Sequence, residues 1–237
     1  MHWKSTVSSK LFAVAILASF TPNLVWAAST SASSGDASGT SARTAEQLKL
    51  DNEWADIIHE AGKQRMLLQK MTKEFLLVAK GTNAEANRQS MQMSIAEYDK
   101  AQASLNANPI VLNSERIKEV EHKVDVDWPP LKSIFESKVD TIGMDAESLK
   151  IVVDVDHRSE DLYTKSDAVV EALIDGAKAA GAAVSGAVVN IADRQTMLVQ
   201  RMVKEAYLIG LGVEVQHNRE LLQATAELYD ASHNGYD

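Results

Sequence analysis

Residues 61–74 read AGKQRMLLQKMTKE and residues 192–205 read ADRQTMLVQRMVKE, so the chain contains two copies of one segment. The second copy follows the first at a spacing of 131 residues, and the register continues without a gap to positions 99 and 230. Over these two stretches 15 of 39 aligned positions are identical. A helical segment that occurs twice indicates a protein assembled from modules, and the positions where the copies differ point to function.

The rest of the sequence predicts an all-α protein, an antiparallel helical bundle. Residues that favour helices dominate, and aromatic residues make up only 5% of the chain. The third predicted helix contains Trp128-Pro129-Pro130, which we expect to kink or break it, since proline lacks an amide hydrogen and clashes with the preceding turn. The expected helices span about 45–80, 84–106, 114–142, 145 to beyond 174, 188–211 and 214 almost to the end.

The first predicted helix has apolar side chains at alternating spacings of three and four. This seven-residue repeat is typical of a helix that packs along a partner helix. Gln64 is the one polar member of the seam. The seam consists of Trp54, Ile57, Ala61, Gln64, Leu68, Met71, Phe75 and Val78.

Two helical modules follow from this pattern. Residues 45–175 form a first module of four helices that can close an antiparallel bundle. Residues 176–237 form a second module, a helical hairpin that repeats only the first two helices. A lone apolar hairpin cannot cover its inner face. It therefore stacks end-on through the fourth helix, packs on the first bundle, or pairs with a second chain as a homodimer.

The beginning of the chain predicts export. Residues 1–27 have two lysines, a short apolar run and a Val-Trp-Ala ending, as in a secretory signal peptide. The alternative, an uncleaved membrane anchor, is disfavoured because the run is shorter than the roughly 20 residues of a spanning helix. Residues 28–44 form a Ser/Gly/Ala leader that we expect to be disordered. We therefore expect a periplasmic or secreted protein with no membrane span after cleavage.

Charge and composition exclude several classes of function. The net charge is −9, which disfavours nucleic acid as a partner because phosphate contacts need clustered Lys and Arg. The chain has no Cys, so it has no disulfide, no thiol nucleophile and no covalently attached haem. No catalytic triad, phosphate loop or pair of catalytic carboxylates stands out. We expect neither an enzyme nor a cofactor.

Metal binding is the weaker interpretation of two further patterns. Carboxylate and histidine residues at i and i+3 share a helix face, as in two-metal bundles, but here they lie among other charged residues and fit a solvated surface better. These pairs are Asp56 with His59, Glu119 with His122, and Asp154 with His157. The methionines of the motif (Met66, Met71, Met197 and Met202) fit flexible core packing better than a soft-metal site.

The motif carries a family resemblance. Ala61-Gly62-x-x-Arg65-Met66 followed by Gln69-Lys70-Met71, together with the second copy, resembles the first-helix signature of bacterial periplasmic sensor domains. The nearest are the N-terminal domain of type IV pili methyl-accepting chemotaxis transducers (PilJ-type) and the related domain of nitrate/nitrite sensor kinases. The resemblance covers roughly residues 45–235 and implies a sensory module that signals through a partner such as a membrane receptor.

The resemblance also implies a binding site. In the nitrate-sensor relatives the motif arginine binds a small planar anion, a role that falls here on Arg65, since a guanidinium offers a planar donor fork to nitrate or a carboxylate. Gly62 would allow close approach, Lys63 adds positive charge, and Gln64 and Met66 adjoin the site. In the second copy Asp193 replaces Gly62 and Thr196 replaces Arg65, which leaves Arg194 and Gln195 as weaker equivalents.

Two alternatives remain open. Arg65 can be a structural residue that pairs with an acidic side chain, as many arginines beside a helical seam do. The whole protein can equally be a structural or interaction accessory of a pilus or envelope assembly that binds no small ligand.

Overall fold

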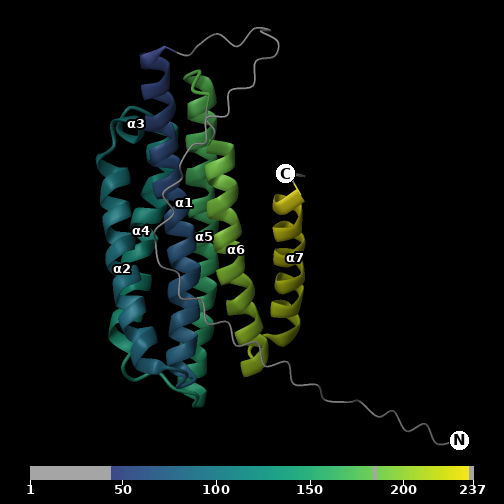
Figure 1. The fold of residues 1–237 in the computed structure, drawn as a ribbon. Helices are drawn as coiled ribbons and strands as arrows, with labels where there is room; N and C mark the ends of the chain where they lie inside the picture. Colours follow the sequence, from purple (N-terminus) through teal and green to yellow (C-terminus); the bar gives the residue numbers. More distant parts are fainter. Residues whose placement is uncertain (1–43, 184–185, 235–237) are drawn as a thin grey trace, which may run out of the picture. The chain divides into compact units, whose positions relative to one another are not determined.

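A computed structural model describes residues 44–183 and 186–234. The predicted signal peptide, 1–27, and the predicted leader up to residue 43 lie outside the described residues. Within these ranges the chain forms helices and no strand, which confirms the predicted all-α fold (Figure 1). The helices are α1 (Ala45–Ala79), α2 (Ala84–Ala107), α3 (Pro109–Leu112), α4 (Glu115–Lys138), α5 (Ala146–Ala179), α6 (Gly186–Leu211) and α7 (Val215–Asn234).

Short polar residues set the starts of three long helices. The Thr44 hydroxyl accepts a hydrogen bond from the Gln47 amide at 3.1 Å, and Ser114 caps α4 in the same way. Asp145 accepts from the amides of Glu147 and Ser148, both at 3.0 Å, at the start of α5. Each side chain satisfies amides that have no partner within the helix, so these boundaries follow from local sequence.

Of the predicted kink or break at the two prolines of the third long helix, the break does not occur. Helix α4 runs without interruption through Pro129 and Pro130. Both prolines are exposed, and the carbonyl groups that lose their helical donors are those of Asp125, which is half-buried, and Val126, which is exposed to water. Trp128, directly before Pro129, is buried, and its packing keeps this segment against the bundle.

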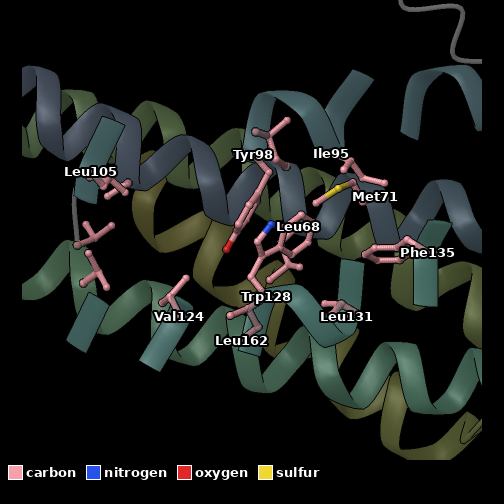
Figure 2. Close-up of a cluster of buried hydrophobic side chains, with 14 of the residues drawn as sticks. Leu68, Met71, Ile95, Tyr98, Leu105, Val124, Trp128, Leu131, Phe135 and Leu162 are labelled. Carbon is pink, nitrogen blue, oxygen red and sulfur yellow. The ribbon is translucent and has the colours of Figure 1, made fainter. Parts of the chain in front are cut away.

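Helices α1, α2, α4 and α5 form the predicted four-helix bundle, with α1 packed against α2 and α5, and α4 packed against α5 (Figure 1). Every member of the predicted seam of α1 is buried. Figure 2 shows Leu68 and Met71 of α1 among side chains of the facing helices, including Tyr98 and Phe135. Tyr98 lies against Trp128 with the ring centroids 4.1 Å apart.

The second hairpin packs on this bundle. Helix α6 lies along α1, and α7 packs on α6 (Figure 1). Helices α1 and α6 run in the same direction, since His59 contacts Asp193 and Lys73 donates to Gln200, the latter at 2.7 Å. Of the three placements left open by the sequence, the structure shows packing on the first bundle.

The repeat is visible in the backbone of both hairpins. Gly81 ends α1 with a φ of +73°, and Gly212 ends α6 with a φ of +75°. Two residues later Asn83 and Glu214 both take the left-handed conformation. In each turn an asparagine side-chain amide then donates to the carbonyl of the residue after the glycine. Asn87 donates to Thr82 at 2.8 Å, and Asn218 donates to Val213 at 3.0 Å.

A close contact between α1 and α5 depends on a glycine. A Cβ atom on Gly176 would lie 2.7 Å from the Trp54 ring, closer than packed atoms approach. The Trp54 ring is itself buried at this contact, so it would have to shift to admit the added atom. Gly210 in α6 is the opposite case, because nothing lies within 4 Å of a Cβ built there.

A layer of polar side chains crosses the inside of the bundle. Gln64 donates to Gln102, and Gln102 donates to Glu121 at 2.6 Å and to Asp125 at 2.7 Å. Glu121 is 2% exposed. Burial, together with the negative charge of Asp125, raises the pKa of Glu121 to about 7, although the Gln102 hydrogen bond lowers it.

Glu121→Gln is expected to raise the free energy of unfolding above pH 7. A carboxyl group whose pKa is raised in the folded state contributes stability that is fully present below the unfolded-state pKa and is lost as pH rises through about 7. The amide keeps the acceptor for Gln102 but carries no charge, so we expect a gain of about 1–3 kcal/mol at about pH 8. Urea unfolding at a series of pH values measures it.

The control for this experiment is Glu119→Gln on the same helix, because the Glu119 side chain is 75% exposed. It should leave the pH profile unchanged. If Glu121→Gln follows the wild-type pH dependence between about pH 5 and about pH 8, Glu121 does not titrate in that range.

Gly176→Ala and Gly210→Ala are expected to change stability in opposite directions. Alanine is the better helix former by about 1 kcal/mol at both positions. At Gly176 the clash with the Trp54 ring outweighs this, and we expect a net loss of about 1–2 kcal/mol. At Gly210 we expect a gain of up to about 1 kcal/mol, and the first copy already has alanine at the matching position, Ala79. Denaturant unfolding measures the change in the free energy of unfolding for both variants. A change in the same direction in both would contradict the packing described.

Candidate functional site

The motif segment of α1 sends consecutive side chains in different directions, because each helical residue turns by about 100°. Gly62 faces α6, where a Cβ atom would lie 2.9 Å from the Asp193 carboxylate. Asp193 is the residue that replaces Gly62 in the second copy, so the two copies of the motif meet at their matching positions. The close approach expected of Gly62 is therefore an approach to a second helix.

The neighbours of Gly62 are not gathered in one pocket. The Lys63 ammonium points toward α2 and lies 3.7 Å from the Glu97 carboxylate. Gln64 belongs to the polar layer inside the bundle. Met66 is half-buried and packs against the apolar core. These three residues surround the arginine in sequence, but the structure separates their side chains.

Arg65 is the buried cation of the motif. Its side chain is 3% exposed, and its Nη1 donates to Oδ1 of Asp167 on α5. The Asp167 side chain is 38% exposed, so this ion pair joins a buried guanidinium to a carboxylate that reaches it from the surface. A planar fork at the inner end of such a pair can hold any flat anion that takes the place of the carboxylate.

A polar stripe on α5 receives the cations of α1 and α6. The stripe consists of Asp156, Glu160, Tyr163 and Asp167, spaced so that all four share one helix face. Burial and the charge of Asp167 raise the pKa of Tyr163, whereas the positive charges of three arginines lower it. These arginines are Arg65, Arg201 and Arg194, and all three therefore lie within electrostatic range of the Tyr163 ring.

The inner end of the stripe is a buried ionic network. Lys204 is fully buried and donates to Asp156 at 2.7 Å and also to Glu160. Burial alone would lower the pKa of Lys204, but the two carboxylates raise it above its ordinary value. Arg201 donates to Glu160 at 2.8 Å and lies over the Tyr163 ring, 5.1 Å from its centroid. This network holds α6 against α5.

One ion pair of the network occurs in both copies of the repeat. In α6, Arg201 donates to Glu205 at 2.9 Å, and the Thr225 hydroxyl of α7 donates to the same carboxylate at 3.0 Å. In the first copy the matching pair is Lys70 with Glu74, 3.0 Å apart. In each copy the glutamate of this pair therefore ties its helix to the second helix of the hairpin, since Ser90 of α2 donates to Glu74 as Thr225 does to Glu205.

Of the weaker second-copy candidates, Arg194 lowers the pKa of Tyr163, as Arg65 does. Gln195 is half-buried on α6, and the neighbouring Thr196 is exposed. The residues that sequence reasoning missed are the α5 stripe together with Arg201 and Lys204. A signal was present, because acidic and aromatic residues at spacings of four, three and four form a polar face on an otherwise amphipathic helix.

The candidate metal pairs lie on the surface or in ion pairs. Glu119 and His122 are exposed, His59 lies 2.9 Å from Asp193, and His157 lies 2.9 Å from Glu214. Among the residues that the structure describes, no cluster of three or more acidic or histidine side chains could hold a metal ion. Nor does any helix in that part of the chain combine the length and apolar character needed to cross a membrane.

Comparison with known proteins gives a family match over the first part of the chain. No curated protein and no solved structure matches the chain. One family model matches residues 44–139, the part that holds α1 to α4 and the first copy of the motif. The match confirms the family resemblance of the motif: residues 44–139 are similar to the PilJ family, the N-terminal domain of type IV pili methyl-accepting chemotaxis transducers.

Proposed function

We propose that this chain is a periplasmic sensory module of the chemotaxis-transducer type that captures a small planar anion at Arg65. The family match over residues 44–139 supports the sensory class. The observation that carries the site is the ion pair between Arg65 and Asp167, in which the guanidinium is buried and the carboxylate is half-exposed.

The unequal burial of this pair decides which partner can be replaced. Breaking a buried ion pair leaves an uncompensated charge, which costs several kcal/mol, so Arg65 needs an anion in every state of the protein. Asp167 reaches Arg65 from the surface and can return to water at little cost, because its side chain is already 38% exposed. An external nitrate or carboxylate can therefore take its place while Arg65 stays in position.

The surroundings of Arg65 favour an anion over a neutral ligand. Arg201 and Arg194 add positive charge near Tyr163, beside the same face of α5. The resemblance to the sensor domain of nitrate/nitrite sensor kinases supports the same ligand class. There the matching arginines of two subunits cooperate, whereas here α6 brings the second copy of the motif alongside α1 within one chain.

Binding of an anion at Arg65 would change the contacts that α5 makes with α1. Asp167 ties α5 to α1, and a ligand that displaces it removes that tie. The ties from Glu160 to Arg201 and Lys204 remain, so α5 keeps its hold on α6 while its hold on α1 weakens. A ligand shifts a helix arrangement only by its difference in affinity for two states, and displacement of Asp167 supplies such a difference.

The second candidate function is an interaction accessory of a pilus or envelope assembly without a small ligand. The exposed apolar residues of the α6–α7 hairpin favour this function, since Val199, Val203 and Leu228 are each at least 37% exposed. The two functions differ in what the Arg65 site does, and the ligand experiment separates them.

The experiment measures the thermal midpoint of the purified protein with nitrate, nitrite, formate and acetate, against chloride at equal ionic strength. A ligand that binds the native state raises the midpoint by mass action. Asp167→Asn removes the competing charge and should strengthen binding about tenfold or more, because an internal carboxylate no longer occupies the fork. Arg65→Lys keeps the charge but loses the planar fork and should lose the shift.

The matched control is Asp161→Asn on the same helix, where the carboxylate is 63% exposed and pairs with Lys165. It should respond to each anion as the wild type does. If neither the wild type nor Asp167→Asn responds to any of the anions up to about 100 mM, the Arg65 site holds no small anion. The interaction function would then be favoured.

A further inference from the structure

The α6–α7 hairpin has an uncovered apolar face on the side away from α1. We call it the hairpin face and define it by Val199, Met202, Val203 and Ala206 of α6 with Leu222 and Ala226 of α7. Val199 is 40% exposed and Val203 is 37% exposed, although both are large apolar side chains. None of the six carries a charge.

Comparison with the first copy of the repeat shows which side of the hairpin this face is. The matching residues of the first copy are all buried, and they form the core of the four-helix bundle. They are Leu68, Met71, Thr72, Phe75, Met91 and Ile95. The hairpin face is therefore the core-facing side of a bundle module, presented to solvent in the second copy.

The first copy also shows what kind of structure covers such a face. There α5 packs on α1, and α4 packs on α5 and α2, so an antiparallel pair of helices completes the bundle. One position shows that the cover of the second copy differs in chemistry. The Thr72 hydroxyl donates to Ser159 of α5 at 2.7 Å, whereas the second copy has Val203 at this position. Its partner must be apolar there.

We propose that the hairpin face of one chain pairs with the hairpin face of a second copy of this chain, which completes a second four-helix bundle between two protomers. The α6–α7 hairpin is itself an antiparallel pair of helices with one apolar face, so it has the form that α4 and α5 supply in the first bundle. A two-fold axis brings Val203 and its neighbours against the same apolar residues of the other copy.

The size and shape of the face fit this partner. A helical hairpin of about 20 residues per helix is about 30 Å long and about 20 Å wide, which gives about 600 Å² per protomer. Two such faces bury about 1,200 Å², which lies at the lower end of stable protein interfaces. Three positions have smaller side chains than the first copy (Val199 for Leu68, Ala206 for Phe75, Ala226 for Ile95), which lets two like faces approach closely.

Sedimentation equilibrium of the purified protein tests this pairing at about 1 to about 100 µM, a range that detects dissociation constants in the micromolar region. We expect the wild type to approach the mass of a dimer as concentration rises. Val199→Glu and Val203→Glu should each shift it to a monomer with unchanged far-ultraviolet circular dichroism, because both side chains are already exposed in the single chain. Charges facing each other across the two-fold axis oppose association.

The matched control is Val126→Glu, since Val126 is a 56% exposed valine on α4, outside the hairpin face. It should dimerise like the wild type. The chain has no cysteine, so Ala206→Cys introduces a single thiol that should form a disulfide-linked dimer on mild oxidation, whereas Val126→Cys should not. A wild type that stays monomeric at about 100 µM, or a dimer that survives Val199→Glu and Val203→Glu, would overturn the proposal.

Discussion

The structure depends on the burial of α1 between three other helices. It packs against α2, α5 and α6, and 18 of its 35 residues are buried. A helix with a single apolar stripe buries only the residues of that stripe. Here polar side chains such as Arg65, Gln69 and Glu74 are buried as well, and each needs a partner on a neighbouring helix. The carboxylates of α5 and the serines of α2 are placed accordingly.

The sequence predicts the parts of this arrangement that depend on neighbouring residues. Side-chain caps such as Thr44 and Asp145 set helix starts, the alternating seam identifies the core face of α1, and Gly81 ends the helix. The position of the second hairpin could not be predicted in this way. An apolar pattern shows which face of a helix is covered but not which helix covers it.

Only the Arg65 part of the candidate site could be predicted from the sequence. Arg65 stands out because it belongs to a repeated motif, but its partner Asp167 lies 102 residues further along the chain. The prolines of α4 show the limit of a local rule. The rule predicted a kink or a break, yet the helix continues through Pro129 and Pro130, which are exposed, while Trp128 before them is buried. The partner of Arg65 and the continuity of α4 both depend on how the helices pack in three dimensions. That packing cannot be derived from a single sequence.

The differences between the two copies have a physical explanation. In the first copy α5 covers Arg65 and supplies Asp167, so a buried arginine can be held there. In the second copy the matching residue, Thr196, is exposed, and an arginine at that place would lie in water, where a single anion is held weakly. By contrast, Glu205 pairs with Arg201 and accepts from Thr225 of α7, as Glu74 pairs with Lys70 and accepts from Ser90 of α2. The repeat keeps the contacts that hold each hairpin together.

Helix α6 therefore connects the proposed anion site with the proposed pairing of two chains. One side of it holds Arg201 and Lys204 against the α5 stripe, and the other side is the hairpin face. A ligand that releases Asp167 changes the hold of α5 on α1, while Glu160 still binds both cations of α6. If α5 moves, the ion pairs of Glu160 with Arg201 and Lys204 would carry that movement to α6 and so to the hairpin face on its other side. Pairing of two chains through that face would then respond to the anion, since linkage between two sites on one element is reciprocal.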